Sequence, residues 1–426
     1  AILGMVLMIA IAAALSTHRS RIPWRLAGIG LGLQLLFGVL VLRVDLIAEG
    51  FRWLSRFFVE VLSFADAGAK FLFGNLVKEE YQDTFGVIFA FEILPIIVFF
   101  SALTSALYYL GIFQHIIRGI AWMMVRTMRL TGAESLAAAG NVFIGQTEAP
   151  LLVKPFLSKM TRSELNAVMT GGMATIAGSV MAAFVRFLGG SDPQMQELFA
   201  THLLSASIMS APAALVMAKI LVPESETGRL GSELNIRLEQ KAVNLLDALT
   251  LGTSDGLRLA VNVGAMLLAF IAVIAMLNAI LMDGLGAATG LNAWVRETTD
   301  GQFEGFTLQY LFGQVFRPLA YLIGVDWQDS LTVGSLLGQK TVINEFIAYD
   351  ALGRLPEGAI SLKSKIISTY ALCGFANFSS VAIQIGGLSS LAPNQRPVLS
   401  QLGLRALLGG TFASLLTAAI AGMLIT

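Results

Sequence analysis

Long apolar runs divide most of the chain into segments that match the thickness of a lipid bilayer. A helix needs about 20 mainly apolar residues to cross one. Eight runs approach this length: Ala1–Ser16, Leu26–Leu42, Phe85–Leu110, Leu165–Leu188, Phe199–Val222, Leu259–Met282, Ile366–Leu388 and Leu404–Thr426. Because the first run leads directly into another, we expect no cleavable signal peptide. The pattern predicts an all-α polytopic membrane protein with about eight transmembrane helices.

Two further apolar stretches, Leu136–Leu157 and Leu331–Leu352, are interrupted by glycines and polar residues. Each could cross the membrane once, or could enter and return as a helical hairpin. Gly145, Gln146 and Asn344 are suitable turn residues for such a hairpin. Non-helical backbone at membrane depth is tolerated only where protein or a water-filled cavity surrounds it. We interpret both stretches as re-entrant helical hairpins.

Basic residues in the connections orient the spans, because lysine and arginine concentrate on the cytoplasmic side. Four connections carry them: Arg19, Arg21 and Arg25; Arg118, Arg126 and Arg129; Lys219, Arg229, Arg237 and Lys241; Arg396 and Arg405. With both hairpins re-entrant, these connections share one side and both termini lie outside, whereas two full crossings would break the agreement. Residues 43–83 and the basic residues between 354 and 365 would lie outside and fit this scheme less well.

Two connections alternate apolar and charged positions at helical spacing, and each predicts an amphipathic helix. They are Phe51–Leu62 and Leu234–Leu251. We expect both helices to lie in the plane of the membrane interface.

The overall composition agrees with a membrane protein. Hydrophobic residues make up 56% of the chain and charged residues 13%, and the mean hydropathy is +0.74. Soluble domains carry about 25% charged residues, so a water-facing surface of ordinary size is excluded. The net charge of zero gives no argument for a nucleic-acid partner. A single cysteine, Cys373, and three scattered histidines argue against disulfide frameworks and against thiolate or histidine metal clusters.

Two carboxylates stand in corresponding positions of the two half-chains, Glu148 and Glu345. A charged side chain near the bilayer centre costs about 2.5–3.5 kcal/mol on insertion scales, so such residues are rarely kept without use. The pair indicates a polar ligand site inside the membrane protein, which is the pattern of a secondary transporter. The alternative for Glu148 is a kinked span in which it pairs with Lys154. Glu92 allows two interpretations, a proton site or packing against an arginine, and Arg186 is expected to extend toward the interface.

The residues around the carboxylates suggest what the site would bind. Gly145, Pro150 and Pro155 argue against one straight helix, and a break frees carbonyls for a hard cation such as sodium and amides for a hydrogen-bonding ligand. In the second half, Asn377 and Ser380 share a helix face. They match a hydroxyl-rich ligand such as a sugar, and the neighbouring phenylalanines at 375 and 378 could stack on a planar ring.

Three segments carry a resemblance to a known family: Gly145–Pro150, Gly338–Lys340 followed by Asn344–Tyr349, and Gly374–Ser380. In this order they resemble the signature segments of concentrative nucleoside transporters, most of all the sodium-coupled bacterial members. The likeness extends from the first span to the last. It implies a homotrimer in the plasma (inner) membrane, whose protomers each hold an outer scaffold and an inverted-repeat transport core.

The resemblance also implies a division of the chain. Scaffold helices and an interfacial helix would occupy 1–130. The first hairpin with its partnered span would occupy 131–190, and the second 331–390; together they form the transport core. A scaffold span with an amphipathic interfacial helix falls in 191–258, a scaffold span with an extracellular connection in 259–330, and the last span in 391–426.

Individual residue roles follow from the same resemblance, with the nucleoside bound between the hairpin tips and the broken spans. The residues that would face the nucleobase end are Gln146, Thr147, Glu148 and Val180. Those that would hold the ribose hydroxyls are Glu345, Asn377 and Ser380, and Phe375 would lie against the ligand. Sodium would bind at Asn141, Ile144, Thr175 and Ile176, mostly through backbone carbonyls, with a hydroxyl from Thr147 or Thr175. The family often has serine at the position of Thr175, and either hydroxyl can be a ligand.

The function that we expect is sodium-coupled symport of nucleosides, uridine-like in kind, by alternating access, without catalysis and without an organic cofactor. Proton coupling through Glu148 or Glu345 is the alternative within transport. A channel is less consistent with two closed hairpin tips. An intramembrane enzyme is a remote alternative, because the chain lacks a plausible pair of aspartates, a serine–histidine pair or a histidine metal cluster.

Overall fold

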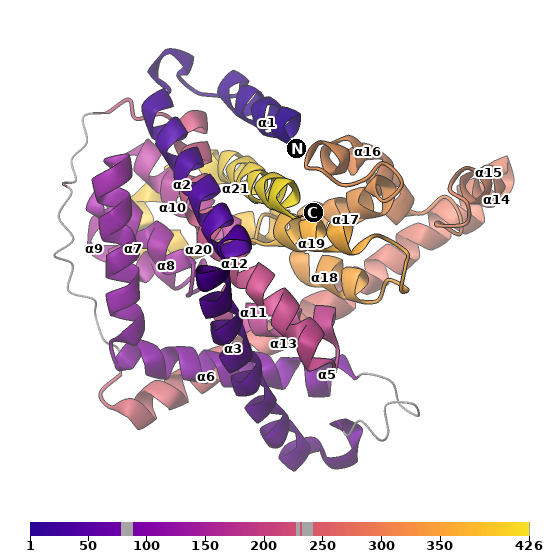
Figure 1. The fold of residues 1–426 in the computed structure, drawn as a ribbon, viewed down its shortest axis with the longest axis horizontal. Helices are drawn as coiled ribbons and strands as arrows, with labels where there is room; N and C mark the ends of the chain where they lie inside the picture. Colours follow the sequence, from indigo (N-terminus) through magenta and orange to yellow (C-terminus); the bar gives the residue numbers. More distant parts are fainter. Residues whose placement is uncertain (78–87, 227–230, 232–241, 426) are drawn as a thin grey trace.

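The computed structural model describes residues 1–77, 88–226, 231 and 242–425, and in these residues all regular secondary structure is helical. Among them, six helical segments are long and apolar enough to cross a membrane: Trp24–Arg43, Phe89–Tyr109, Arg162–Gly189, Pro193–Leu221, Leu245–Thr289 and Pro393–Leu424. The two other expected spans appear as shorter helices, α1 (Ile2–Ala14) and the pair α19 (Leu362–Leu372) and α20 (Phe378–Leu391). The predicted all-α polytopic architecture is confirmed (Figure 1).

Both predicted hairpins are present. The first descends as α8 (Gly132–Asn141), turns through residues 142–148, and returns as the 3₁₀ segment η4 (Ala149–Val153) and the short helix α9 (Lys154–Leu157). Proline stands in the first turn of both η4 and α9, where its missing N–H leaves no helical bond unmade. The second hairpin consists of α17 (Ser330–Val342) and α18 (Glu345–Gly353).

Each hairpin is followed by a helix that is broken near its middle. The first is α10 (Arg162–Ala174) and α11 (Gly178–Gly189), and the second is α19 and α20. The two breaks touch: a Cβ at Gly374, which has a φ of +117°, would lie 2.7 Å from the Met173 carbonyl oxygen. Only glycine fits both this conformation and this space. The repeated order of hairpin and broken helix is the predicted inverted repeat.

Two long helices complete the buried centre of the molecule. They are α12 (Pro193–Leu221) and α21 (Arg396–Leu424), which pack against α10 and against each other. A buried ion pair ties α12 to the first hairpin, because Lys219 Nζ lies 2.6 Å from a Glu134 carboxylate oxygen. Glu134 also completes a capping box with Thr131 at the start of α8, and α10 begins with the same motif, Thr161 with Glu164. The ion pair and caps fix the helices that carry the first hairpin and its partner.

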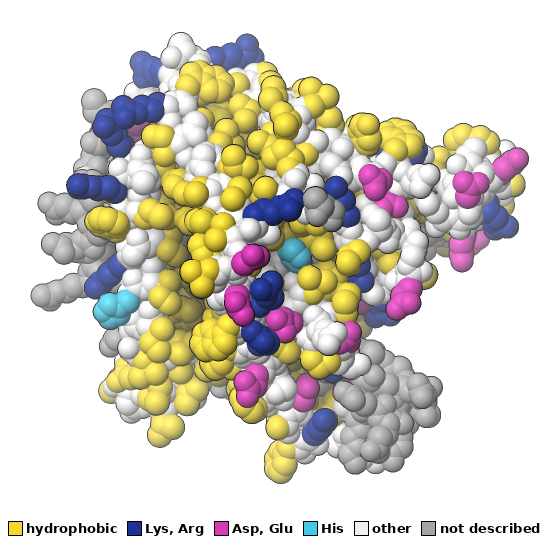
Figure 2. Space-filling view, in the orientation of Figure 1, with side chains coloured by type: hydrophobic (Ala, Val, Ile, Leu, Met, Phe, Trp, Pro, Cys, Tyr) yellow, Lys and Arg dark blue, Asp and Glu magenta, His cyan; other side chains and the backbone are white. Residues whose placement is uncertain are grey.

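The outermost long helix is α13 (Leu245–Ala279), which pairs with α6 (Leu94–Tyr109). The two backbones approach closely at Gly252, where a Cβ would lie 2.6 Å from Ser105 Cβ. At 35 residues, α13 is about 50 Å long, which exceeds the roughly 30 Å of a bilayer core. Many of its apolar side chains are exposed, among them Leu268 at 75%. Much of the surface seen in Figure 2 is likewise apolar.

Several helices differ from the sequence-based expectation. The predicted interfacial helix at 51–62 lies inside the longer α3 (Asp45–Phe73). Of the second predicted interfacial segment, residues 234–241 lie outside the described residues, and Leu245–Leu251 belongs to α13. Leu245–Leu251 therefore does not form a separate interfacial helix, because α13 continues through Gly252 and Gly256, where its backbone packs closely against α6.

The remaining helices connect these layers. They are η1 (Arg19–Arg21), α2 (Trp24–Arg43), η2 (Gly74–Val77), α5 (Phe89–Glu92), α7 (Ile112–Met128), η5 (Ile280–Gly286), α14 (Ala287–Thr289), α15 (Leu291–Thr298), α16 (Leu308–Leu322) and η6 (Pro393–Gln395). The apolar pattern of the sequence predicts no helix at the ranges of α7 and α16. Helix α16 packs along α17 and so supports the second hairpin, while α7 packs along α8 and supports the first.

Candidate functional site

A polar network lies where the break between α19 and α20 meets the second hairpin. Asn377 Nδ2 donates to Glu345 Oε2 at 2.6 Å, and Asn377 Oδ1 accepts from the Ser380 backbone N–H at 2.8 Å. Asn377 is therefore both the N-cap of α20 and a fixed donor to the carboxylate. Glu345 is the first residue of α18, and the N-terminus of a helix favours a negative charge. The predicted ribose-end residues are brought together.

The first hairpin joins the same network through its turn. Gln146 Nε2 donates to Ser380 Oγ at 3.1 Å, and Gln146 Oε1 accepts from Gln384 Nε2 at 2.9 Å. The two repeats are therefore joined here by direct side-chain hydrogen bonds between residues more than 230 positions apart in the sequence. A carboxylate, three amides and a hydroxyl at the junction can together accept and donate hydrogen bonds to a small polar ligand.

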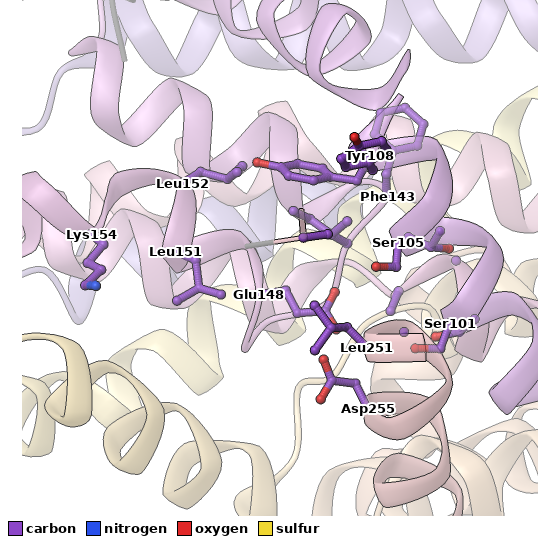
Figure 3. Close-up of a pocket in the computed structure, with 18 residues that line it drawn as sticks. Ser101, Ser105, Tyr108, Phe143, Glu148, Leu151, Leu152, Lys154, Leu251 and Asp255 are labelled. Atoms are coloured by element: carbon purple, nitrogen blue, oxygen red, sulfur yellow. The ribbon is translucent and has the colours of Figure 1, made fainter. Parts of the chain in front are cut away.

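The other predicted base-end residues lie around this junction in different surroundings. Thr147 and Glu148 are exposed, while Val180 and Phe375 are 1% and 7% exposed. Glu148 borders a cavity of about 190 Å³ between the first hairpin, α6, α11 and α13. Figure 3 shows Asp255 of α13 bordering the same cavity, with Ser101 and Ser105 of α6 along its wall. Of the residues predicted to bind the substrate, only Glu148 lines this cavity, so the cavity reaches only this edge of the predicted site.

A second group of residues has the character of a cation site. Asn141 ends α8, is 1% exposed, and neither its side-chain oxygen nor its nitrogen has a hydrogen-bond partner. Leaving a buried amide unpaired costs about 1–3 kcal/mol, and a bound cation would satisfy the oxygen. The carbonyl end of a helix also favours positive charge. Asn141 is the strongest sign in the structure that this position holds an ion.

The predicted partners of Asn141 come from the adjacent break between α10 and α11. Asn141 Nδ2 lies 3.3 Å from where a Cβ on Gly171 would be, one turn before Thr175. The Phe143 carbonyl accepts from Gly178 N–H at 3.0 Å, which holds the turn of the hairpin against the break. Thr175 Oγ1 donates to the Gly171 carbonyl at 2.9 Å, so its lone pairs are left to accept. Ile144 and Ile176 are buried beside them. Amide, hydroxyl and carbonyl oxygens form a donor set that fits sodium.

A buried lysine maintains the second break. Lys340 of α17 is 2% exposed and donates to the Ala371 carbonyl at 3.0 Å and to Ser414 Oγ at 3.5 Å. Ser414 Oγ in turn donates to the Cys373 carbonyl at 2.6 Å. The last carbonyls of a helix have no partner within it, so a lysine and a hydroxyl at this place satisfy the end of α19.

The two charged residues Glu92 and Arg186 behave partly as expected. Arg186 of α11 lies 3.8 Å from Glu92 of α5, and their side chains are 14% and 6% exposed. Packing of Glu92 against an arginine is therefore the correct interpretation. The expectation that Arg186 extends to the interface was wrong, because an intramembrane carboxylate offers it a closer partner.

Sequence reasoning missed Gln384, Lys340 and Asp255 as members of this region. The position of Gln384 did carry a signal: it follows Asn377 by seven residues and Ser380 by four, so all three share one face of α20. Lys340 stands in the segment Gly338–Lys340 that carries the family resemblance, but the carbonyl and hydroxyl that it approaches belong to helices distant in the sequence. Asp255 gave no comparable signal.

Three family profiles match the chain. "Na+ dependent nucleoside transporter N-terminus" matches residues 3–76, "Nucleoside recognition" residues 90–191, and "Na+ dependent nucleoside transporter C-terminus" residues 202–422. Solute carrier family 28 member 3 of Rattus norvegicus is 42% identical over 99% of this chain and 58% of its own length. Sodium/nucleoside cotransporter 1 of Homo sapiens is 40% identical over 99% of this chain and 63% of its own. The chain thus spans less than two thirds of the length of these relatives.

Solved structures of similar fold cover the whole chain. The structure of CNTnw in an inward-facing substrate-bound state has a TM-score of 0.88 and 40% sequence identity, and it covers 99% of this chain and 96% of its own. A variant of CNTnw in an outward-facing state has a TM-score of 0.90 with 40% identity, covering 99% and 97% of the two chains.

Proposed function

Because the chain belongs to the concentrative, Na+-dependent nucleoside transporter family, we propose that it is a multi-pass symporter that imports nucleosides together with sodium. The observation that carries the proposal is the network formed by Glu345, Asn377, Ser380 and Gln146, in which both repeats supply polar groups to one buried junction.

A nucleoside suits this junction group by group. The ribose hydroxyls would donate to Glu345 and accept from Asn377 or Ser380, and the base would lie toward Gln146, Thr147 and Glu148. Val180 and Phe375 would supply apolar contact. In the absence of ligand, Asn377 and Glu345 bond to each other at 2.6 Å, so the ligand would join groups that are already positioned. We expect uridine to be accepted.

Sodium would bind where the unpaired Asn141 side chain meets the break of α10 and α11, with Ile144, Thr175 and Ile176 supplying further oxygens. Of the two hydroxyl candidates, Thr175 is buried in this region and Thr147 is exposed. Bound sodium would fix the turn of the first hairpin, which carries Gln146, and so would complete the nucleoside site. An inward sodium movement is driven by about 2.3 kcal/mol per charge for each 100 mV of membrane potential.

Transport would proceed by movement of the hairpins and broken helices, in 131–190 and 331–390, past a scaffold that includes α6 and α13. The Glu92–Arg186 ion pair joins a scaffold helix to the core, and it would break or shift during this movement. The exposed apolar face of α13 leaves room for lipid and for two further copies of the chain, and we propose a homotrimer in the plasma (inner) membrane.

Binding measurements test the proposal and its coupling ion. Calorimetric titration of uridine into the purified protein should give a Kd at least about fivefold lower in sodium chloride than in choline chloride, within the usual range of coupling between sites. By reciprocity, uridine should lower the Kd for sodium by the same factor. An identical uridine Kd in both salts, with a marked dependence on pH, would favour proton coupling through Glu148 or Glu345 instead.

A further inference from the structure

Gln384 is a buried amide that links the two repeats at the edge of the proposed nucleoside site. It lies on α20 one turn after Ser380, and it is 2% exposed. Its Nε2 donates to two atoms of the first repeat, the Met169 backbone carbonyl at 3.1 Å and Gln146 Oε1 at 2.9 Å. Gln384 therefore reaches from the second broken helix to both α10 and the turn of the first hairpin.

These contacts fix which end of each amide faces which partner. A backbone carbonyl can only accept, so the nitrogen of Gln384 must face Met169. The same nitrogen then needs an acceptor from Gln146, which must present its oxygen. The nitrogen of Gln146 is thereby turned toward Ser380 Oγ, which accepts at 3.1 Å. The orientation of a side-chain amide is often ambiguous, but here the Met169 carbonyl determines the orientation of Gln384 and, through it, that of Gln146.

The structure makes space for this pair of amides and leaves one atom unsatisfied. A Cβ at Gly172 would lie 2.6 Å from Gln384 Nε2 and 3.0 Å from Gln146 Cβ, so a glycine is needed where the amides pass α10. Gln384 Oε1 is buried and has no hydrogen-bond partner.

We propose that Gln384 is a positioning residue that holds Gln146 and Ser380 as hydrogen-bond donors toward the ligand. Ser380 already accepts from Gln146, so its proton is available to donate, and Gln146 retains a second N–H. The inference rests on the proposed function, and it adds the substrate class: nucleosides whose base presents an acceptor, a carbonyl oxygen or an unprotonated ring nitrogen, at this edge. A base with a C–H or N–H group there is disfavoured.

The test compares nucleosides that differ by single acceptor atoms, with Gln384→Met as the main variant. Methionine has a similar shape and no donor. Binding of uridine, 2-thiouridine and 4-thiouridine is measured by calorimetry in saturating sodium, because each thio analogue replaces one carbonyl oxygen with a much weaker sulfur acceptor. In the parent, loss of the contacted acceptor should weaken binding roughly three- to tenfold, as expected for one hydrogen bond. In Gln384→Met, the same analogue should differ from uridine by less than about twofold, because the Gln146 amide can turn.

Controls separate this role from a general effect on folding. Gln34→Met removes another buried glutamine, whose side chain donates to Thr417 at 2.7 Å and makes no contact with the network. It should leave the affinity ratio of every analogue to uridine unchanged. Gly172→Ala crowds the same amide pair, so it should also lose the discrimination between analogues. It serves as the test variant if Gln384→Met yields no folded protein. In a Gln146→Ala background, Gln384→Met should have no further effect on the ratios.

Two results would overturn the inference. One is an unchanged set of analogue ratios in both Gln384→Met and Gly172→Ala. The other is a uniform loss of affinity for all analogues, which would make Gln384 a packing residue. Absence of saturable nucleoside binding by the parent protein would instead contradict the proposed function, so the two failures are distinguishable.

Discussion

Replacing Glu345 with glutamine isolates the charge of the proposed ribose contact. Glu345 is 4% exposed and accepts from Asn377 Nδ2 at 2.6 Å. Asn377 cannot turn its amide, because its oxygen caps the Ser380 N–H. The introduced amide must therefore present its oxygen to Asn377 and its nitrogen to the ligand. The substitution removes a charge and also turns an acceptor for ribose hydroxyls into a donor.

The expected loss follows from the strength of a hydrogen bond to a charged group, about 1.5–3 kcal/mol. This corresponds to a rise in the uridine Kd of roughly ten- to 150-fold. Calorimetry with uridine and its 2′-deoxy and 3′-deoxy analogues measures it. The deoxy analogue that lacks the contacted hydroxyl should lose affinity in the parent and much less further affinity in Glu345→Gln. Glu304→Gln, at an exposed position between α15 and α16, is the control and should bind like the parent.

The reasoning would be refuted if parent and Glu345→Gln responded identically to every sugar deletion. In that case Glu345 would not contact the ribose, whatever its effect on overall affinity.

Three further predictions follow from other parts of the structure. Thr175→Ala should raise the sodium concentration for half-maximal uridine binding several-fold while leaving the protein folded; an unchanged sodium dependence would move the ion site elsewhere. Lys340→Met should lower the melting temperature of the purified protein, since a buried carbonyl left without its donor costs about 1–3 kcal/mol. The control Lys159→Met, at an exposed position, should leave it unchanged. Equal melting temperatures for the parent and Lys340→Met would disprove the role of Lys340 at the break. In a Cys373→Ser background, an impermeant thiol reagent should label cysteines at Arg126 and Ser158 from the cytoplasm and one at Glu357 from outside; labelling the first two from opposite faces would contradict the first hairpin.

The sequence predicted the spans and hairpins because their signal is local. An apolar run of about 20 residues specifies a span by its length, and Pro150 and Pro155 specify an interruption by their missing N–H groups. Helices α7 and α16 gave a weaker signal, because each has a polar face and is too short to cross. The helix from Leu245 was divided wrongly because its polar first turns resemble an interfacial segment, although nothing in them ends a helix.

The candidate site was predicted where residues cluster in one segment and missed where partners are distant. Asn377 and Ser380 lie one turn apart, so their shared face can be read directly from the sequence. Lys340 and Gln384 lie in helices that also carry other polar residues, so their partners cannot be read from their own helices. What they do depends on the carbonyls of Ala371 and Met169, whose proximity only the packing of the helices reveals. The resemblance to the transporter family is confirmed by the comparisons, while the individual ligand roles and the nearness to bacterial members stay predictions.

Uptake into proteoliposomes tests sodium–nucleoside symport most directly. Radiolabelled uridine should accumulate inside the vesicles above its external concentration when sodium is high outside. Replacing external sodium with choline, or collapsing the sodium gradient with an ionophore, should reduce the internal concentration to equilibrium or below. Uridine that only equilibrates, at a rate independent of sodium, would contradict symport, and accumulation driven by a pH gradient alone would assign the coupling to protons.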